Sequence, residues 1–164
     1  MDSQKFTEEV LKIEKLLYRV SWSMLSDQQD CADAVQEAVA RAWEKRCTLR
    51  NEKAFKQWLV QILSNICRDM LRKRQKQASA PLDEERLAEM VDDTDVFSMQ
   101  EILQCLSPDY RVIVTLHYVE GYRIRDIAQM LDVPVGTVKS RLMRARTLLR
   151  GVFETQSELQ GGTK

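Results

Sequence analysis

The chain contains 164 residues, of which 44% are hydrophobic, and its 25 basic and 25 acidic residues give a net charge of zero. This length can form one modest hydrophobic core or two small ones. The sequence contains no apolar run of about 18 residues, and it opens with a polar, acidic segment, MDSQKFTEEV. These features exclude a membrane-spanning helix and favour a cytoplasmic protein without membrane insertion.

The neutral total hides segments of opposite charge. Residues 27–37 contain four acids and no base, whereas residues 68–76 contain five bases and one acid. Residues 83–101 then carry eight acids against one base, and residues 123–150 carry seven bases against two acids. This segregation predicts two separate basic surfaces suited to DNA, with an acidic stretch between them that faces something else.

Hydrophobic periodicity predicts two amphipathic helices in the first 45 residues. The first ends near Ser26, and its apolar residues recur at spacings of four and three: Phe6, Val10, Ile13, Leu17, Val20 and Met24. The second directs Asp30, Asp33 and Glu37 outward, and its core face consists of Ala34, Val35, Ala38, Val39 and Ala42.

A third helix is predicted from its core face, which consists of Phe55, Leu59, Ile62, Ile66 and Met70. Its other side carries a polar stripe at helical spacing that suits nucleic acid: Gln61, Asn65, Arg68 and Arg72. Phe55 and Trp58 are able to stack on bases, but their helical spacing favours core packing for both. From Gln77 the apolar period fades and Pro81 stands among charges, which predicts a linker before helical patterning returns at Val96.

The C-terminal part predicts a helix-turn-helix. A short amphipathic helix with Ile124, Ile127, Ala128 and Leu131 precedes a turn at residues 132–134, where Pro134 disfavours helical geometry in the residue before it. The next helix buries one stripe, formed by Val138, Leu142, Ala145 and Leu149, and is basic elsewhere. Such a unit places its second helix in a DNA major groove. The alternative is an ordinary pair of packed helices with a solvated basic face.

The four cysteines stand apart in the sequence, without a CxxC pair, and His117 is the only histidine. Zinc sites and disulfide frameworks need clustered or regularly spaced ligands. We therefore predict no metal and no cofactor, and we expect the cysteines to be small buried side chains. The sequence also lacks a Gly-rich phosphate loop and a His/Cys dyad, so we predict that the protein is not an enzyme.

Two sets of motifs, in a fixed order, resemble one known family. Residues 30–37 (DCADAVQE), Trp43, residues 55–59 (FKQWL) and Asn65 resemble the promoter-melting domain of bacterial sigma factors. Residues 106–111 (LSPDYR), 121–122 (GY), 126–128 (DIA) and 134–141 (PVGTVKSR) resemble the second sigma domain of the extracytoplasmic-function (ECF) group of the sigma-70 family. The resemblance covers residues 16–149 and lacks the extra regions of housekeeping sigma factors.

The resemblance implies an all-α fold of two small helical domains, the C-terminal one a helix-turn-helix. Residues 1–76 would form sigma region 2, residues 77–95 an acidic linker, residues 96–152 sigma region 4, and residues 153–164 a polar, disordered tail. Such a factor recruits core RNA polymerase to specific promoters in the bacterial cytoplasm. Its partners would be core polymerase, promoter DNA and an anti-sigma factor.

In region 2, the resemblance implies that the acidic helix docks on a coiled coil of the largest polymerase subunit through Asp30, Asp33, Gln36 and Glu37. Contacts with the minus-ten element are implied for Leu49, Asn51, Lys53, Gln61, Asn65, Arg68 and Arg72. The loop at residues 49–53 would capture one flipped base of the non-template strand. Leu49 and Asn51 depart from the aromatic and basic-glycine pattern that is common in this loop. A solvated acidic face is the alternative for the docking helix.

In region 4, the resemblance implies that the recognition helix reads the minus-thirty-five element through Thr137, Lys139, Ser140, Arg141 and Arg144. Arginine suits guanine because its two donors meet O6 and N7 together. Contacts to phosphate are expected for Arg123, Arg125 and Arg146. The acidic linker would run through the polymerase cleft into the RNA exit path, or it would be an ordinary disordered linker.

Two other functions compete with this interpretation. A free-standing helix-turn-helix regulator that binds a palindrome as a dimer leaves the N-terminal half unexplained. A nucleic-acid-modifying enzyme would place His117 and a cysteine in its site, but a lone histidine on a helix is more often structural. A test of co-purification with core polymerase distinguishes the sigma factor, the free-standing regulator and the enzyme.

Overall fold

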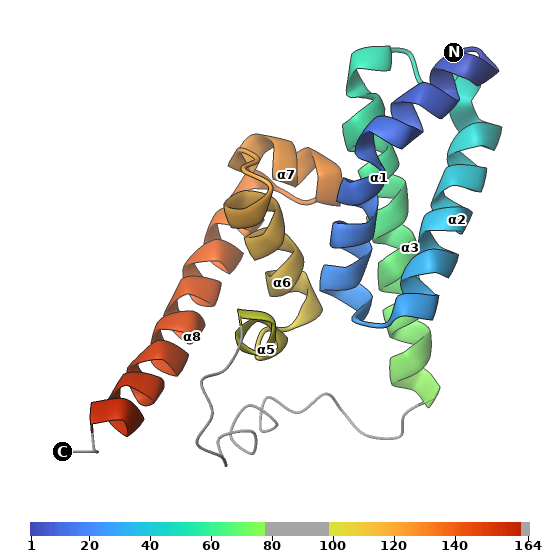
Figure 1. Cartoon of the computed structure of the whole chain (residues 1–164). Helices are drawn as coiled ribbons and strands as arrows, with labels where there is room; N and C mark the ends of the chain where they lie inside the picture. The colour runs from blue at the N-terminus through green and yellow to red at the C-terminus, as the bar shows by residue number, and fades with distance from the viewer. Residues whose placement is uncertain (78–98, 162–164) are drawn as a thin grey trace.

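The computed structural model describes residues 1–77 and 99–161, and every regular element in those ranges is helical, as predicted (Figure 1). The N-terminal half consists of α1 (Ser3–Leu25), α2 (Gln28–Lys45), the short 3-10 turns η1 (Arg46–Thr48) and η2 (Glu52–Ala54), and α3 (Phe55–Gln77). The C-terminal half consists of α5 (Met99–Gln104), α6 (Pro108–Val114), the π-helical turn η3 (Thr115–Val119), α7 (Ile124–Leu131) and α8 (Val135–Gly161).

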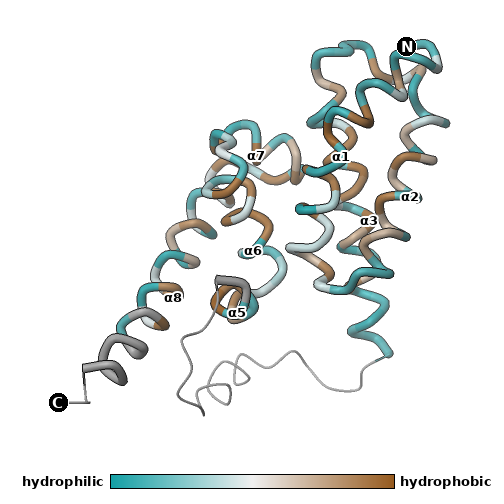
Figure 2. Tube along the Cα trace, in the orientation of Figure 1, coloured by the Kyte–Doolittle hydropathy of each residue, from teal (hydrophilic) through white to brown (hydrophobic). Residues whose placement is uncertain are grey.

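Helices α1, α2 and α3 pack on one another around an apolar core. Each is amphipathic, and Figure 2 shows hydrophobic residues recurring along all three until the last turns of α3, which are hydrophilic throughout. At one end of this bundle Phe6 packs edge-on against Trp43 and Phe55, with ring centroids 5.2 and 5.5 Å apart. Phe55 is buried and Trp58 packs partly buried against the core, which confirms the packing interpretation of both.

The turn between α1 and α2 is defined by two local signals. Ser26 adopts the left-handed region with a φ of 52° and donates its N–H to the Trp22 carbonyl, which ends α1. Asp27 then caps α2, since its Oδ1 accepts the Asp30 N–H at 2.9 Å. The acidic helix therefore starts at a fixed position next to the end of α1.

Replacing Asp27 with alanine is expected to lower the free energy of unfolding by about 1 kcal/mol, because the first turn of α2 loses an acceptor for its N–H groups. Urea unfolding followed by circular dichroism measures the change. Asp27→Asn is the matched control, since it removes the charge but keeps the acceptor oxygen, and it should lose only a few tenths of a kcal/mol. An equal loss in both variants would assign the effect to the charge.

The C-terminal unit contains the predicted helix-turn-helix in α7 and α8. Asp132 adopts the left-handed region with a φ of 52°, and the Val133 N–H bonds to the Ala128 carbonyl at 3.1 Å, which ends α7. The Pro134 carbonyl then accepts the Thr137 and Val138 N–H groups at the start of α8. The predicted stripe of α8 is confirmed, because Val138, Leu142 and Ala145 are buried and Leu149 is partly buried.

Between α6 and α7 the chain forms one π-helical turn. The Glu120 N–H bonds to the Thr115 carbonyl five residues earlier, at 3.0 Å. Gly121 follows with a φ of 75°, a conformation that favours glycine, and the Tyr122 N–H bonds to the Leu116 carbonyl at 2.9 Å. The helix that begins at Pro108 therefore changes from α-helical to π-helical geometry before it ends.

The two halves of the chain lie against each other. Helix α7 packs along α3 and α6 packs along α1, so that one continuous core cluster includes residues from both halves. Figure 1 shows α7 next to the α1–α3 bundle, with α8 extending away from it. The sequence predicts two helical domains, but it does not indicate that they touch.

Two predicted segments remain. The acidic linker at residues 77–95 lies outside the described residues, apart from Gln77 at the end of α3. In contrast, α8 continues through residues 153–161, for which the expectation is a disordered tail beyond the recognition domain. The segment continues the helix because it contains no proline and consists largely of residues that tolerate helical geometry, such as Glu154, Gln156 and Glu158.

Candidate nucleic-acid interface

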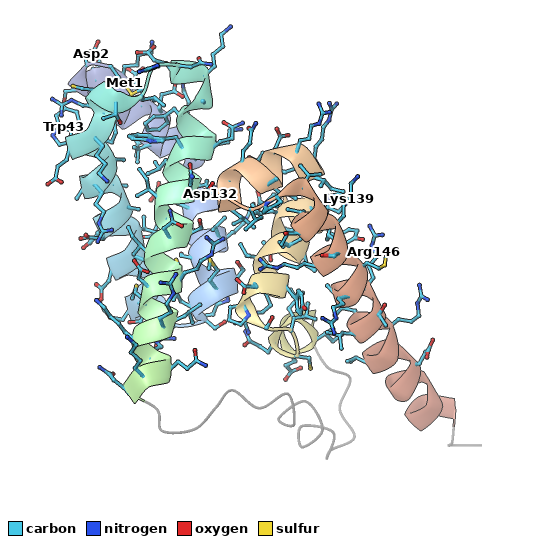
Figure 3. The ribbon with its side chains drawn as sticks, turned by 180° about the vertical axis from the view of Figure 1, so that it is seen from behind. Met1, Asp2, Trp43, Asp132, Lys139 and Arg146 are labelled. Carbon is cyan, nitrogen blue, oxygen red and sulfur yellow. The ribbon has the colours of Figure 1, made fainter. Side chains whose placement is uncertain are left out.

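The start of α8 presents the predicted recognition side chains. Lys139, Ser140 and Arg144 are exposed, whereas Thr137 and Arg141 are half-buried. Within the described residues, the Lys139 and Arg144 side chains form neither a hydrogen bond nor an ion pair with the rest of the chain. Lys139 and Arg146 lie on the outer side of α8, away from α3 (Figure 3). The helix thus offers free cations along a face that is rigidly supported by the buried stripe behind it.

The three arginines that are predicted to contact phosphate differ in whether their side chains already have a bonding partner. Arg123 and Arg125 are exposed at the start of α7, and their side chains have no bonding partner among the described residues. The Arg146 guanidinium instead donates to the Tyr118 hydroxyl, and its carbon lies 5.6 Å from the Tyr118 ring centroid. Arg146 is therefore held in one orientation before any partner arrives.

The polar stripe of α3 is only partly exposed, which corrects the expectation of a wholly solvent-facing stripe. Asn65 and Arg72 are exposed, but Gln61 and Arg68 are half-buried. Arg68 donates to Asn65 Oδ1 at 3.2 Å and to the carbonyl of Leu131, at the end of α7, at 2.7 Å. Helical spacing correctly places the stripe away from the core of the bundle, but it does not reveal that α7 covers part of it.

The loop before α3 is held from both sides. Arg46 stacks over the Trp43 ring, 3.7 Å from its centroid, and donates to the Trp43 carbonyl at 2.7 Å. Asn51 accepts the Lys53 N–H at 3.0 Å and so caps η2. Leu49 packs half-buried against the core, which leaves Asn51 and Lys53 exposed at the loop surface.

A carboxylate from the same loop faces α1. Glu52 accepts a hydrogen bond from the Lys5 ammonium. This bond lowers the pKa of Glu52 and raises the pKa of Lys5, because it stabilises the charged form of both groups. Both side chains are exposed, so the pair orients the loop more than it stabilises the fold.

The acidic helix α2 presents three of its four predicted residues to solvent. Gln36 is exposed, Asp33 accepts from Gln29 at 3.0 Å, and Glu37 pairs with Arg41 at 2.7 Å. Asp30 is the exception, because it is half-buried and forms an ion pair with Arg74 of α3. The expectation that all the acids point outward is therefore wrong for Asp30, whose partner lies too far along the chain for helical periodicity to reveal it.

A groove of about 510 Å³ separates the acidic helix from the basic end of α3. Helix α2 lines the groove with Asp33, Glu37 and Arg41, and α3 lines it mainly with cations, at Arg72, Lys73 and Lys76, together with Ile66, Asp69 and Met70. The groove brings together two segments of opposite charge that lie about 40 residues apart in the sequence.

The histidine and the cysteines form no common site among the described residues. His117 Nδ1 lies 3.0 Å from the Tyr122 carbonyl, a contact that holds the turn after η3. Cys31 and Cys67 are buried together, and burial raises the pKa of the Cys67 thiol to about 12. Cys47 is exposed and Cys105 is partly exposed, so the prediction of buried cysteines is wrong for these two. No group of three potential metal ligands occurs in the described part of the chain.

One buried cation is not indicated by the sequence pattern. Arg111 is 9% exposed, and it donates from Nε to the Ser23 carbonyl at 2.8 Å and from Nη1 to Gln104 Oε1 at 2.9 Å. Burial lowers the pKa of its guanidinium. A lone arginine in a helical stretch usually lies at the surface, so only the three-dimensional contact with α1 reveals its position.

None of the helices in residues 1–77 and 99–161 has the length and apolar character needed to span a bilayer.

Family models match both halves of the chain. Residues 10–77 match the model described as Sigma-70 region 2, and residues 97–149 match the model described as Sigma-70, region 4. The first covers the α1–α3 bundle from Val10 onward, and the second covers the helix-turn-helix unit as far as Leu149.

Individual proteins are similar over most of their length. RNA polymerase sigma factor SigV of Bacillus subtilis is 32% identical over 140 residues, which span 81% of each chain. ECF RNA polymerase sigma factor SigM of Mycobacterium tuberculosis is 31% identical over 153 residues, which span 90% of this chain and 76% of SigM. Among solved structures, sigma factor RpoE of Bartonella quintana, crystallised with the anti-sigma factor NepR, has the same fold, with a TM-score of 0.69, 24% identity and coverage of 98% and 99%. The chain belongs to the ECF sigma factors of the sigma-70 family.

Proposed function

We propose that this sigma factor reads the minus-thirty-five element with the first turns of α8 and opens the minus-ten element with α3 and the loop before it. The observation that best supports this division is the free, exposed cations at the start of α8, on a helix whose opposite face is buried. A recognition helix needs both properties, because its side chains must reach base edges while its backbone is held rigidly.

Within α8, Arg141 and Arg144 are the proposed base-reading residues, since a guanidinium binds guanine O6 and N7 at once. Thr137, Lys139 and Ser140 lie in the same turns and complete the contact surface. Arg123 and Arg125 are proposed to bind phosphate and so set the register of the helix in the groove. Arg146 would join them from its position on Tyr118, at little further cost in side-chain entropy.

On region 2, Asn65 and Arg72 are the proposed first contacts with the minus-ten strand, because both are exposed on α3. Gln61 and Arg68 extend this surface along the helix. At the N-terminal end of α3, the loop would hold one flipped base against Leu49, Asn51 and Lys53. Hydrogen bonds to the exposed base edge would there replace base pairing and stacking. The Arg46–Trp43 stack keeps this loop in one shape.

Asp33, Gln36 and Glu37 form the proposed docking surface for a basic coiled coil of core RNA polymerase, because they are exposed on one helix. Asp30 contributes through Arg74, which ties α2 to the basic end of α3. The acidic residues 83–95, which lie outside the described residues, would occupy the basic RNA exit path.

We propose further that the factor acts in the bacterial cytoplasm, that an anti-sigma factor holds it inactive, and that it has no catalytic activity of its own. The RpoE structure of the same fold contains an anti-sigma factor, which supports this form of control. Strand opening would be driven by binding energy rather than by covalent chemistry.

Run-off transcription with purified core polymerase, followed by genome-wide mapping of the starts, tests this function directly. The expected result is a set of starts that share two sequence elements at constant spacing. Starts no different from those of core polymerase alone would overturn the proposal, and specific binding of a palindrome without polymerase would favour the free-standing regulator.

The free chain is expected to bind core polymerase tightly and promoter duplex weakly. Each half offers a small basic contact, and only polymerase holds the two at the spacing of the two elements, so the gain in effective concentration needs the complex. Fluorescence anisotropy with a labelled promoter fragment, with and without core polymerase, measures the difference. Tight, specific duplex binding by the free chain would contradict it.

A further inference from the structure

An exposed aromatic side chain lies beside the recognition helix. Tyr118, in η3, is 52% exposed, and its hydroxyl accepts a hydrogen bond from Nε of Arg146 on α8. The guanidinium carbon of Arg146 lies 5.6 Å from the centroid of the Tyr118 ring. Because Tyr118 precedes α7, it belongs to neither helix of the helix-turn-helix. A residue from outside the motif therefore reaches the outer side of α8.

The Tyr118 ring is held in place by its neighbour in η3. His117 packs edge-on against it, with ring centroids 4.9 Å apart. His117 Nδ1 in turn lies 3.0 Å from the Tyr122 carbonyl, and the Tyr122 N–H bonds to the Leu116 carbonyl at 2.9 Å. These contacts tie the ring to the turn that leads into α7. The fold therefore places the Tyr118 hydroxyl independently of its bond with Arg146.

The Tyr118–Arg146 pair leaves several hydrogen-bond donors unused. A tyrosine hydroxyl has one O–H donor besides its acceptor lone pairs, and a guanidinium has five N–H donors. Arg146 spends Nε on the hydroxyl, so its two terminal nitrogens have no partner within the described residues. The Tyr118 O–H is likewise unpaired in the described part of the chain. Because the hydroxyl accepts a bond from a cation, it is polarised and becomes a stronger donor. Two kinds of donor therefore lie side by side on an exposed surface.

The position of the pair on α8 suits a phosphate rather than a base. Arg146 lies seven residues after Lys139 and four before Arg150, so these three cations share one flank of the helix. Figure 3 shows Lys139 and Arg146 on the outer side of α8. By helical spacing, this flank lies between the buried stripe and the face that bears Ser140 and Arg144. A helix fills a major groove about 12 Å wide, so its flanks face the phosphate backbones.

We propose that the Tyr118 hydroxyl and the Arg146 guanidinium together bind one backbone phosphate of the minus-thirty-five duplex. The phosphate oxygens would accept the Tyr118 O–H and the terminal N–H groups of Arg146. The site rests on the proposed function, because α8 must lie in the major groove to bring a phosphate to its flank. Tyr118 is uncharged, so its contact raises affinity without releasing a counterion, whereas each arginine contact releases about one. This difference separates Tyr118 from the cations around it.

Single methylphosphonate substitutions in the promoter duplex test the contact. Each substitution replaces one non-bridging phosphate oxygen by a methyl group and removes the charge of that phosphate. Fluorescence anisotropy measures binding of the labelled duplexes to holoenzyme made from core polymerase and the full chain. On the unmodified duplex, Tyr118→Phe should weaken binding by about 3- to 10-fold, because one hydrogen bond to a charged group is lost. The salt dependence of binding should stay unchanged. At one substituted phosphate, the variant and the parent should bind equally well.

Arg146→Ala separates a direct contact by Tyr118 from mere support of the guanidinium. Alone, this variant should reduce the salt slope of binding by about one. Added to it, Tyr118→Phe should weaken binding to the unmodified duplex by about twofold more, because the O–H still reaches the phosphate. The added change should have no effect at the identified methylphosphonate. Tyr18→Phe is the matched control and should bind every duplex like the parent, since it removes a hydroxyl from an exposed tyrosine of α1 whose side chain has no bonding partner within the described residues.

Three results would overturn the role of Tyr118 while the proposed function stands. The first is an unchanged ratio of parent to Tyr118→Phe affinity at every substituted phosphate, and the second is no effect of Tyr118→Phe in the Arg146→Ala background. The third is loss of the difference between parent and Tyr118→Phe when inorganic phosphate replaces chloride at constant ionic strength, which would assign the site to a free anion. Holoenzyme that binds cognate and scrambled duplexes equally would instead overturn the proposed function, because sequence preference does not need Tyr118.

Discussion

Replacing Arg144 with alanine is expected to lower transcription from a cognate promoter by roughly 5- to 100-fold, equivalent to about 1 to 3 kcal/mol. Arg144 is exposed on α8 and its side chain has no partner within the described residues, so the folded chain should lose no stability. The loss should disappear on promoters altered at one minus-thirty-five position, because the guanidinium discriminates there. Run-off transcription across a panel of single-base promoter variants measures this dependence.

Arg123→Ala is the matched comparison, since it removes an exposed guanidinium from the start of α7. Like Arg144, Arg123 has no side-chain bonding partner in the described part of the chain. A phosphate contact carries no base information, so this variant should weaken all promoters alike and reduce the salt dependence of binding by about one counterion. If each variant lowers transcription from every promoter of the panel by the same factor, the division of α7 and α8 into phosphate and base contacts is wrong.

The second large effect is expected in strand opening. The double variant Asn65→Ala with Arg72→Ala should bind core polymerase normally but form the open complex roughly tenfold to a hundredfold more slowly, because unstacked bases lose about 1 to 3 kcal/mol of contacts. Both side chains are exposed and bond only within α3, and Arg68 keeps its bond to the Leu131 carbonyl, so the contact between α3 and α7 should remain. Stopped-flow fluorescence with a base analogue in the minus-ten element follows the opening.

A template with a pre-opened bubble separates melting from docking. It supplies the cost of unstacking in advance, about a few kcal/mol, so much of the lost activity of the double variant should return. Lys15→Ala, at an exposed position on α1, is the control and should behave like the parent on both templates. Normal permanganate reactivity of the minus-ten thymines in the double variant would remove this surface of α3 from promoter opening.

The sequence predicts most of the helices because their signals are local. The stripe of α8 and the turn at residues 132–134 follow from spacing and from Pro134, and the packing of Phe55 follows from periodicity alone. The left-handed residue that ends α7 is Asp132, where glycine is usual, so the turn is indicated by the proline rather than by its own residue.

Contacts between distant residues could not be predicted in the same way. The Asp30–Arg74 pair joins two helices, and Arg68 contacts Leu131 across the interdomain surface. Helical periodicity indicates which face of a helix points away from the core of its own domain. It does not indicate whether a second domain packs against that face. Arg111 is the clearest example, because helical periodicity does not indicate that its buried guanidinium bonds to the carbonyls of Ser23 and Met24 in α1.

The π-helical turn η3 sets how α7 is placed relative to α6. A five-residue repeat is equivalent to one extra residue in an α-helix, and each residue of an α-helix turns the chain by about 100°. If all five residues of Thr115–Val119 became α-helical, the chain after them would rotate and carry Glu120 away from Arg19. The same rotation would carry α7 out of its place on α3. The geometry of this short segment is therefore needed for the contact between α7 and α3.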